Sequence, residues 1–105
     1  MPENADDRPR MALPDDVVAY SRSPEFNRET LPAALQRGHS TKAGTWALIH
    51  VLEGELRYRV LDPRSELVLT PGVPGVVVPQ QLHEVEPLGP VRMFVEFYRR
   101  PETDS

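Results

Sequence analysis

The sequence predicts an all-β protein, an antiparallel β-barrel or jelly roll. Short apolar runs follow one another at close spacing between residues 45 and 98. Twelve prolines lie mostly between these runs, where a missing amide hydrogen does not disturb strand pairing. No long amphipathic helix interrupts the series. Many short strands at close spacing, without a long helix, are typical of closed or two-sheet antiparallel folds.

The first third of the chain has only weak secondary-structure patterns. Residues 1–15 contain prolines and charges without periodicity, so we expect a flexible N-terminal segment followed by a β-barrel over residues 16–100. Residues 101–105 form a short polar tail. A short extended stretch is predicted at residues 17–20. Residues 30–35 fit either one helical turn with an early proline or an edge strand, and both remain open.

The strand pattern strengthens from residue 45. Residues 45–52 are apolar on both faces, which predicts a strand covered on both sides. Glu53 and Gly54 form a turn, and residues 55–60 then alternate strictly, with charges on one face and apolar side chains on the other. Further strands are expected at residues 66–70, 75–79, 84–86 and 91–98.

Size and composition narrow the function classes. A chain of 105 residues is long enough for one domain with one core. Its formal net charge of -4 and scattered basic residues give no support for nucleic-acid binding, which needs a basic surface. Cysteine is absent, so disulfides and thiolate metal ligands are excluded. With no apolar signal segment and no apolar run long enough for a bilayer, a cytoplasmic location is expected, with no membrane partner.

Two of the three histidines bracket the central strands. His39 precedes the long apolar run, and His83 follows the proline turn at residues 79–82. Histidine is the commonest metal ligand among side chains and can also act as an acid or base near neutral pH. The two residues are therefore candidates for a metal site or a catalytic pair. The alternative is that both are hydrogen-bonded structural histidines in a filled barrel.

These residues resemble a known family. The segment at residues 51–56, with His39 upstream and residues 79–83 downstream, is similar to the two-motif pattern of small cupins. Residues 39–46 and 79–86 resemble more closely the tellurite-resistance-type cupin family, whose domain occurs alone or in front of a methyltransferase. The likeness extends from about residue 20 to residue 98. It implies a small cupin-type jelly roll with a site at the barrel mouth.

The chain departs from the general cupin pattern in its ligands. The usual His-x-His reads His39-Ser40-Thr41, and the usual glutamate position is Ala47, whereas His83 matches the histidine of the second motif. The resemblance therefore implies a site of at most two histidines, completed by water or another residue. Glu96, in an otherwise apolar last strand, is the candidate third ligand or general base. Zinc, iron, nickel and manganese are the divalent metals that suit imidazole and oxygen ligands.

The alternation of side chains along the strand at residues 45–52 predicts the face on which the third histidine, His50, lies. If Ala47, Ile49 and Val51 face the interior, as the family pattern implies, then Trp46, Leu48 and His50 share the outer face. Such an apolar outer face predicts a homodimer. The alternative is that the extended stretch at residues 17–20 covers this face within one chain.

The sequence leaves three functions open. The first is a module that binds a metal, small molecule or anion in a stress response such as tellurite resistance. The second is a metal-dependent small-molecule enzyme with Lewis-acid or oxygenase-type chemistry. The third is an interaction domain with a filled barrel. No glycine-rich strand-to-helix loop is present, so a nucleotide-like cofactor, and methyl transfer by this chain alone, are not expected.

Overall fold

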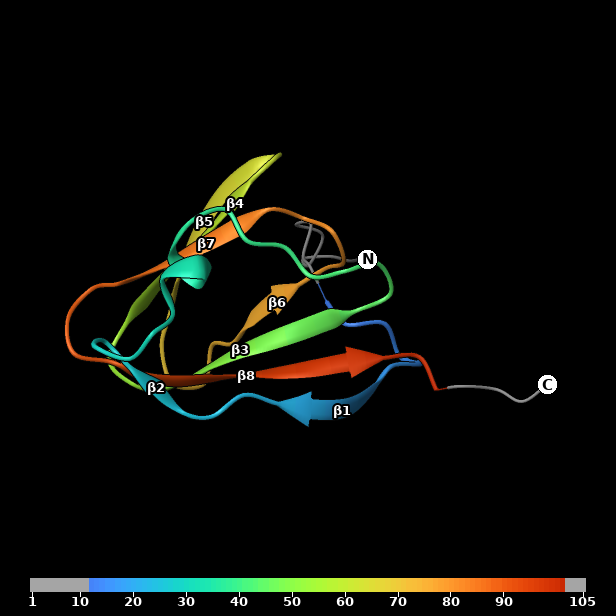
Figure 1. Ribbon diagram of the computed structural model, residues 1–105, viewed down its shortest axis with the longest axis horizontal. Coiled ribbons are helices and arrows are strands. Elements are labelled where there is room, and N and C mark those ends of the chain that lie inside the picture. The colour runs from blue at the N-terminus through green and yellow to red at the C-terminus, as the bar shows by residue number, and fades with distance from the viewer. Residues whose placement is uncertain (1–11, 102–105) are drawn as a thin grey trace, which may run out of the picture.

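The computed structural model describes residues 12–101, which form two antiparallel β-sheets packed face to face (Figure 1). The predicted all-β fold is confirmed. Residues 1–11 of the predicted flexible segment 1–15, and residues 102–105 of the predicted tail 101–105, lie outside the described residues. The strands are β1 (Val18–Arg22), β2 (Phe26–Asn27), β3 (Trp46–Glu53), β4 (Leu56–Leu61), β5 (Arg64–Leu69), β6 (Gly75–Val77), β7 (His83–Pro87) and β8 (Arg92–Arg99).

The larger sheet has the strand order β1-β8-β3-β6, and β2 also pairs with β8. Its central strand, β3, buries alternate residues against the opposite sheet, beginning with Ala47. The residues between them, Trp46, Leu48 and His50, lie on the outer face, as parity predicted. The expected cover on that outer side is not found, because these three residues remain partly exposed.

Arginine side chains lie over two of the aromatic rings on this outer face. The Arg22 guanidinium lies 4.0 Å from the centre of the Phe94 ring, and that of Arg100 lies 4.8 Å from the Trp46 ring. A guanidinium stacked on an aromatic ring shields apolar surface while it keeps its own contact with water. The outer face is therefore a mixed aromatic and cationic surface.

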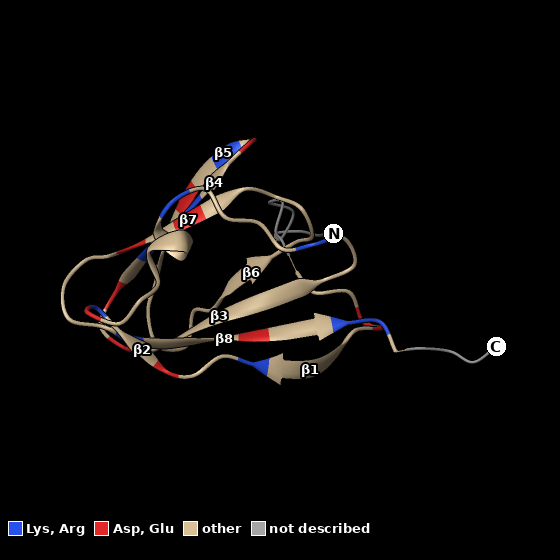
Figure 2. Cartoon of the chain, in the orientation of Figure 1, with Lys and Arg blue, Asp and Glu red and all other residues tan. Residues whose placement is uncertain are grey.

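The smaller sheet has the order β5-β4-β7. The alternation in β4 is confirmed, because Leu56, Tyr58 and Val60 are buried. The two arginines on its other face pair with acidic residues of β5 and β7, such as Arg59 with Glu66 at 2.9 Å. Figure 2 shows acidic and basic residues interspersed along these strands, as expected for a solvated mixed-charge face.

The structure shows the turn between β3 and β4 and decides the conformation of residues 30–35. The turn at Gly54 joins β3 to β4 with a φ of +85°, a conformation that favours glycine. Residues 30–35, for which a helical turn and a strand were both open, lead into a short 3-10 helix at Ala33–Gln36, which follows Pro32. No helix among residues 12–101 is long and apolar enough to cross a membrane.

The extended stretch predicted at residues 17–20 begins strand β1. This strand pairs with β8 at the edge of the larger sheet, with Ala19 opposite Tyr98. All five of its residues are exposed. Strand β1 therefore widens the sheet and does not cover the outer face of β3.

Candidate functional site

The structure brings His39 and His83 together on the inner side of the smaller sheet. Each backbone amide donates to the carbonyl of the other residue at 2.8 Å, so the two form a directly opposed antiparallel pair. Side chains of such a pair project from the same face of the sheet. The two imidazole rings meet edge to face, with their centres 5.5 Å apart and an angle of 86° between their planes.

His83 is held in a defined orientation by its neighbours. Its Nδ1 donates to the Gln81 carbonyl at 3.0 Å, and its ring packs edge-on against the ring of Tyr58. Only 4% of His83 is exposed, and this burial lowers the pKa of its imidazole from the ordinary value of 6.5. The Tyr58 hydroxyl donates to the Val76 carbonyl at 2.9 Å, and burial raises its pKa to about 12. Tyr58 is therefore a neutral structural support for His83.

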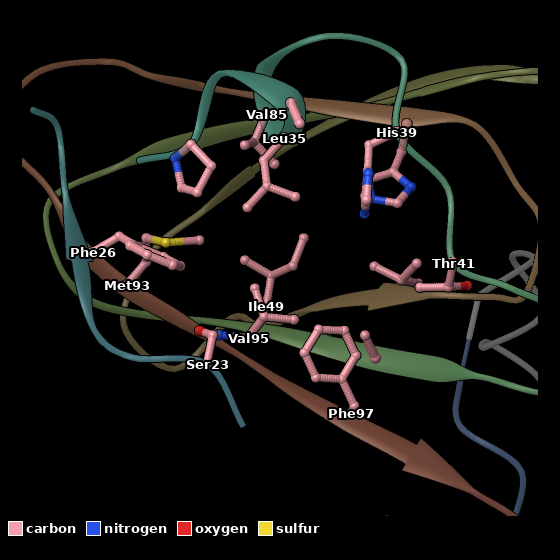
Figure 3. A pocket seen from close by; sticks show the side chains of 15 residues that line it. Ser23, Phe26, Leu35, His39, Thr41, Ile49, Val85, Met93, Val95 and Phe97 are labelled. Atoms are coloured by element: carbon pink, nitrogen blue, oxygen red, sulfur yellow. The ribbon is translucent and has the colours of Figure 1, made fainter. Parts of the chain in front are cut away.

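The histidine pair lies at one end of a cavity of about 340 Å³ between the two sheets. Figure 3 shows His39 at one end and Phe26 and Met93 at the other. The lining is almost entirely apolar. It consists of Ser23, Phe26, Pro32, Ala34, Leu35, His39, Thr41, Ala47, Ile49, Val77, His83, Val85, Met93, Val95 and Phe97. A volume near the lower end of the usual range for ligand pockets can hold one small molecule.

Sequence reasoning identified only part of this lining. From the sequence, the aromatic residues Trp46, Phe94, Phe97 and Tyr98 could form either the walls of a small apolar pocket or plain core. Phe97 lines the cavity, whereas the other three lie on the outer face of the larger sheet. Phe26, Leu35 and Met93 were missed. Parity along β8 could have found Met93, because it alternates with Val95 and Phe97. Phe26 lies in the two-residue strand β2 and Leu35 in the short 3-10 helix, and both elements are too short to show such periodicity.

The structure does not bring Glu96 to the histidine pair. Its neighbours in β8, Val95 and Phe97, line the cavity, so its own side chain projects from the opposite face. There its Oε1 lies 3.0 Å from His50 Nε2 and accepts a hydrogen bond from the Tyr98 hydroxyl at 2.9 Å. The bond from Tyr98, together with that from His50, lowers the pKa of Glu96. The expectation that Glu96 joins His39 and His83 as a third ligand is corrected by this placement.

The donor set at the cavity is small. Among residues 12–101, no group of three or more histidine, aspartate or glutamate side chains converges on a point that could hold a metal. Catalytic zinc sites use three protein ligands and structural sites use four. His39 and His83 therefore supply two ligands, and water or a ligand from outside this stretch would have to complete the shell.

Burial of His83 predicts a pH-dependent stability. Because its pKa is lowered on folding, the unfolded chain binds this proton more tightly. The stabilisation is present above pH 6.5 and is lost as the pH falls through the folded-state pKa. We expect the free energy of unfolding to decrease from pH 7 to pH 5, and His83→Asn, which cannot titrate, to reduce that dependence.

Urea unfolding at several pH values measures this effect. The amide of His83→Asn can still donate toward the Gln81 carbonyl, and His50→Asn on the outer face is the matched control. A difference in stability between wild type and His83→Asn that stays constant from pH 5 to pH 8 would contradict the assignment.

The chain was compared with known proteins. Residues 21–95 match the model of the TehB-like domain. The chain belongs to the TehB-like domain family. The predicted membership of a tellurite-resistance-type cupin family is thereby confirmed. A curated relative from Haemophilus influenzae, named a probable S-adenosyl-L-methionine-dependent methyltransferase TehB, is 34% identical over 82 residues. That match covers 72% of this chain but only 28% of the relative, so the chain spans under a third of that protein.

Solved structures share the TehB-like fold. The crystal structure of TehB from Haemophilus influenzae superposes with a TM-score of 0.75 and 30% identity, covering 82% of this chain and 32% of that one. A crystal structure of a protein from E. coli strain K12 superposes with a TM-score of 0.81. It is covered over its entire length and covers 89% of this chain, at 19% identity. At that identity, the second likeness supports the fold alone.

Proposed function

We propose that this TehB-like domain is a binding module that holds a small apolar molecule between its two sheets, beside His39 and His83. The observation that carries the proposal is the cavity of about 340 Å³. Ligand pockets in proteins are mostly apolar with a few polar groups that orient the ligand. This cavity has such an apolar lining, and the two histidines at one end can orient a small molecule.

The family supports a biological setting for this binding. TehB-like domains are related to a tellurite-resistance protein, and the proposed setting is a cytoplasmic stress response. In that setting the domain would bind a compound without transforming it. No step of methyl transfer is assigned to this chain, because it spans only 28% of the relative whose name includes that activity.

A metal held by His39 and His83 is the second candidate. It is favoured by the bond from His83 Nδ1 to the Gln81 carbonyl, because metal-binding histidines commonly donate their other nitrogen to such a partner. The metal is disfavoured because His39 and His83 supply only two ligands, so we rank it below the small molecule. Elemental analysis of protein purified without a metal-binding tag decides between them: one equivalent of zinc, iron, nickel or manganese, lost in His39→Ala, would support the metal.

Filling the cavity tests the main proposal. Ala34 and its neighbour Ala33 in the 3-10 helix are both exposed, but only Ala34 lines the cavity. We expect Ala34→Trp to weaken binding of an apolar probe such as ethylbenzene at least about ten-fold, because the indole occupies the ligand's space. Ala33→Trp, the matched control, should bind as wild type does.

Titration of ethylbenzene into isotope-labelled protein, followed by amide chemical shifts, provides the affinities. Equal affinity of Ala34→Trp and Ala33→Trp would show that the probe binds elsewhere. No saturable shift at any residue of wild type would contradict the proposed function itself.

Assembly through the outer face remains part of the proposal. Trp46, Leu48 and His50 are partly exposed on one face that β1 does not cover. The aromatic and aliphatic side chains of this mixed aromatic and cationic surface favour pairing of two copies about a two-fold axis. We expect light scattering at micromolar concentration to give twice the mass of one chain, which is 11.9 kDa. A monomer mass would rule this dimer out.

A further inference from the structure

The polar groups that line the cavity differ in whether they are already hydrogen-bonded. The Ser23 hydroxyl donates to the Pro24 carbonyl at 2.8 Å and accepts from the Val95 amide at 2.9 Å. The Thr41 hydroxyl donates to the Thr45 carbonyl at 2.8 Å. His83 Nδ1 donates to Gln81. Among the described residues that line the cavity, these bonds leave His83 Nε2 and the imidazole nitrogens of His39 as the principal polar groups free to meet a ligand.

The free nitrogen of His83 has a defined chemical role. A backbone carbonyl only accepts hydrogen bonds, so Nδ1 of His83 must carry the proton that it donates to Gln81. A neutral imidazole has a single N–H, and its other nitrogen is then a lone-pair acceptor. His83 is buried in apolar surroundings that favour this neutral form. Its Nε2 is therefore a lone-pair acceptor that can receive a hydrogen bond from a donor group of the ligand.

His39 is the second histidine with which a ligand can form a hydrogen bond. The His39 ring stands edge to face with His83, at 5.5 Å between centres, and makes no hydrogen bond to another described residue. A neutral imidazole offers one donor and one acceptor. One ligand group that can both donate and accept is thus able to satisfy the two histidines together. A hydroxyl does so, whereas a carboxylate has no proton to donate and an ammonium would bring an unpaired charge into an apolar cavity.

We infer that the ligand is a neutral, apolar alcohol or phenol whose hydroxyl donates to His83 Nε2 and accepts from His39. This inference rests on the proposed function and names the chemical class of its ligand. The apolar body would extend from the histidine pair toward Phe26 and Met93 at the far end of the cavity (Figure 3). A one-ring phenol with a short alkyl chain has one polar group and an apolar body, as the lining requires.

Three probes of similar shape test the inference near neutral pH: 4-ethylphenol, ethylbenzene and 4-ethylbenzoate. A phenol stays neutral there, and a benzoate is charged. We expect 4-ethylphenol to bind about ten-fold more tightly than ethylbenzene, which is the effect of one net hydrogen bond. The benzoate should bind more weakly than ethylbenzene, because its charge must leave water for the apolar cavity.

The variants assign that preference to His83. In His83→Leu, 4-ethylphenol and ethylbenzene should bind equally, while His50→Leu on the outer face keeps the wild-type preference. If His83→Leu does not fold, the probe series on wild type still decides. Nitrogen-15 spectra of the imidazoles add a direct check, because they should show His83 with its proton on Nδ1 and a shift of Nε2 when 4-ethylphenol binds.

The outcomes separate this inference from the proposed function. Equal binding of 4-ethylphenol and ethylbenzene, tightest binding of the benzoate, or a His83 proton on Nε2 would each overturn the ligand class while leaving the cavity as a binding site. If none of the probes binds, both the inference and the proposed function fail.

Discussion

Gly54→Ala is expected to lower the free energy of unfolding by about 3 kcal/mol, because two costs add at this turn. The left-handed φ of +85° strains any residue with a side chain. An added Cβ would also lie 2.1 Å from the Pro90 carbonyl oxygen, which belongs to the backbone and cannot rotate away. The turn between β3 and β4 would have to shift away from the loop that enters β8.

Gly44→Ala is the matched control for this prediction. Gly44 has a similar φ of +78°, but an added Cβ there meets nothing within 4 Å. It should therefore lose only the conformational part, about 1 kcal/mol. Urea unfolding of both variants measures the difference, and equal losses would show that the contact with Pro90 does not constrain the turn.

Leu69→Ala is expected to cost about 3 kcal/mol, because Leu69 is fully buried and its removal leaves a cavity in a packed core. The Leu69 side chain packs against Gly75. A Cβ added to Gly75 would lie 2.8 Å from the Cδ1 of Leu69. This close packing of β5 against β6 leaves little freedom for the neighbours to refill the gap. The loss should appear as a lower urea midpoint with an unchanged slope.

Leu67→Ala supplies the comparison within the same strand. Leu67 lies two positions earlier on the same face of β5, but 48% of it is exposed. Its truncation should change stability by no more than about 0.5 kcal/mol. Similar losses for the two leucines would contradict the difference in burial between Leu67 and Leu69.

The sequence predicted the strands best where one face is buried and the other is charged. The alternation of residues 55–60 specified β4 correctly, because a shift of one residue would bury Arg57 and Arg59. The parity of β3 likewise placed His50 on the outer face. The cover predicted for that outer face was wrong, because cover depends on how distant segments fold over the sheet.

The histidine pair was predicted from the positions of His39 and His83 on either side of the central strands, and the family resemblance supported it, whereas periodicity did not contribute. His39 lies outside the named strands and meets His83 through one isolated bridge, which no local pattern encodes. The sequence pattern could have excluded Glu96 as a third ligand, because the apolar residues on both sides of it fill the inner positions of β8. The cavity itself could not be predicted, because it is the space that the side chains of both sheets leave unfilled.

The central claim is that a small apolar molecule occupies the space between the two sheets. Intermolecular nuclear Overhauser effects between 4-ethylphenol and methyl-labelled protein test it most directly. The account predicts contacts from the ethyl group to the methyl groups of Met93, Ile49 and Val95, all of which line the cavity. Contacts confined to the outer face around Trp46 and Leu48, or no contacts at saturating probe, would contradict it.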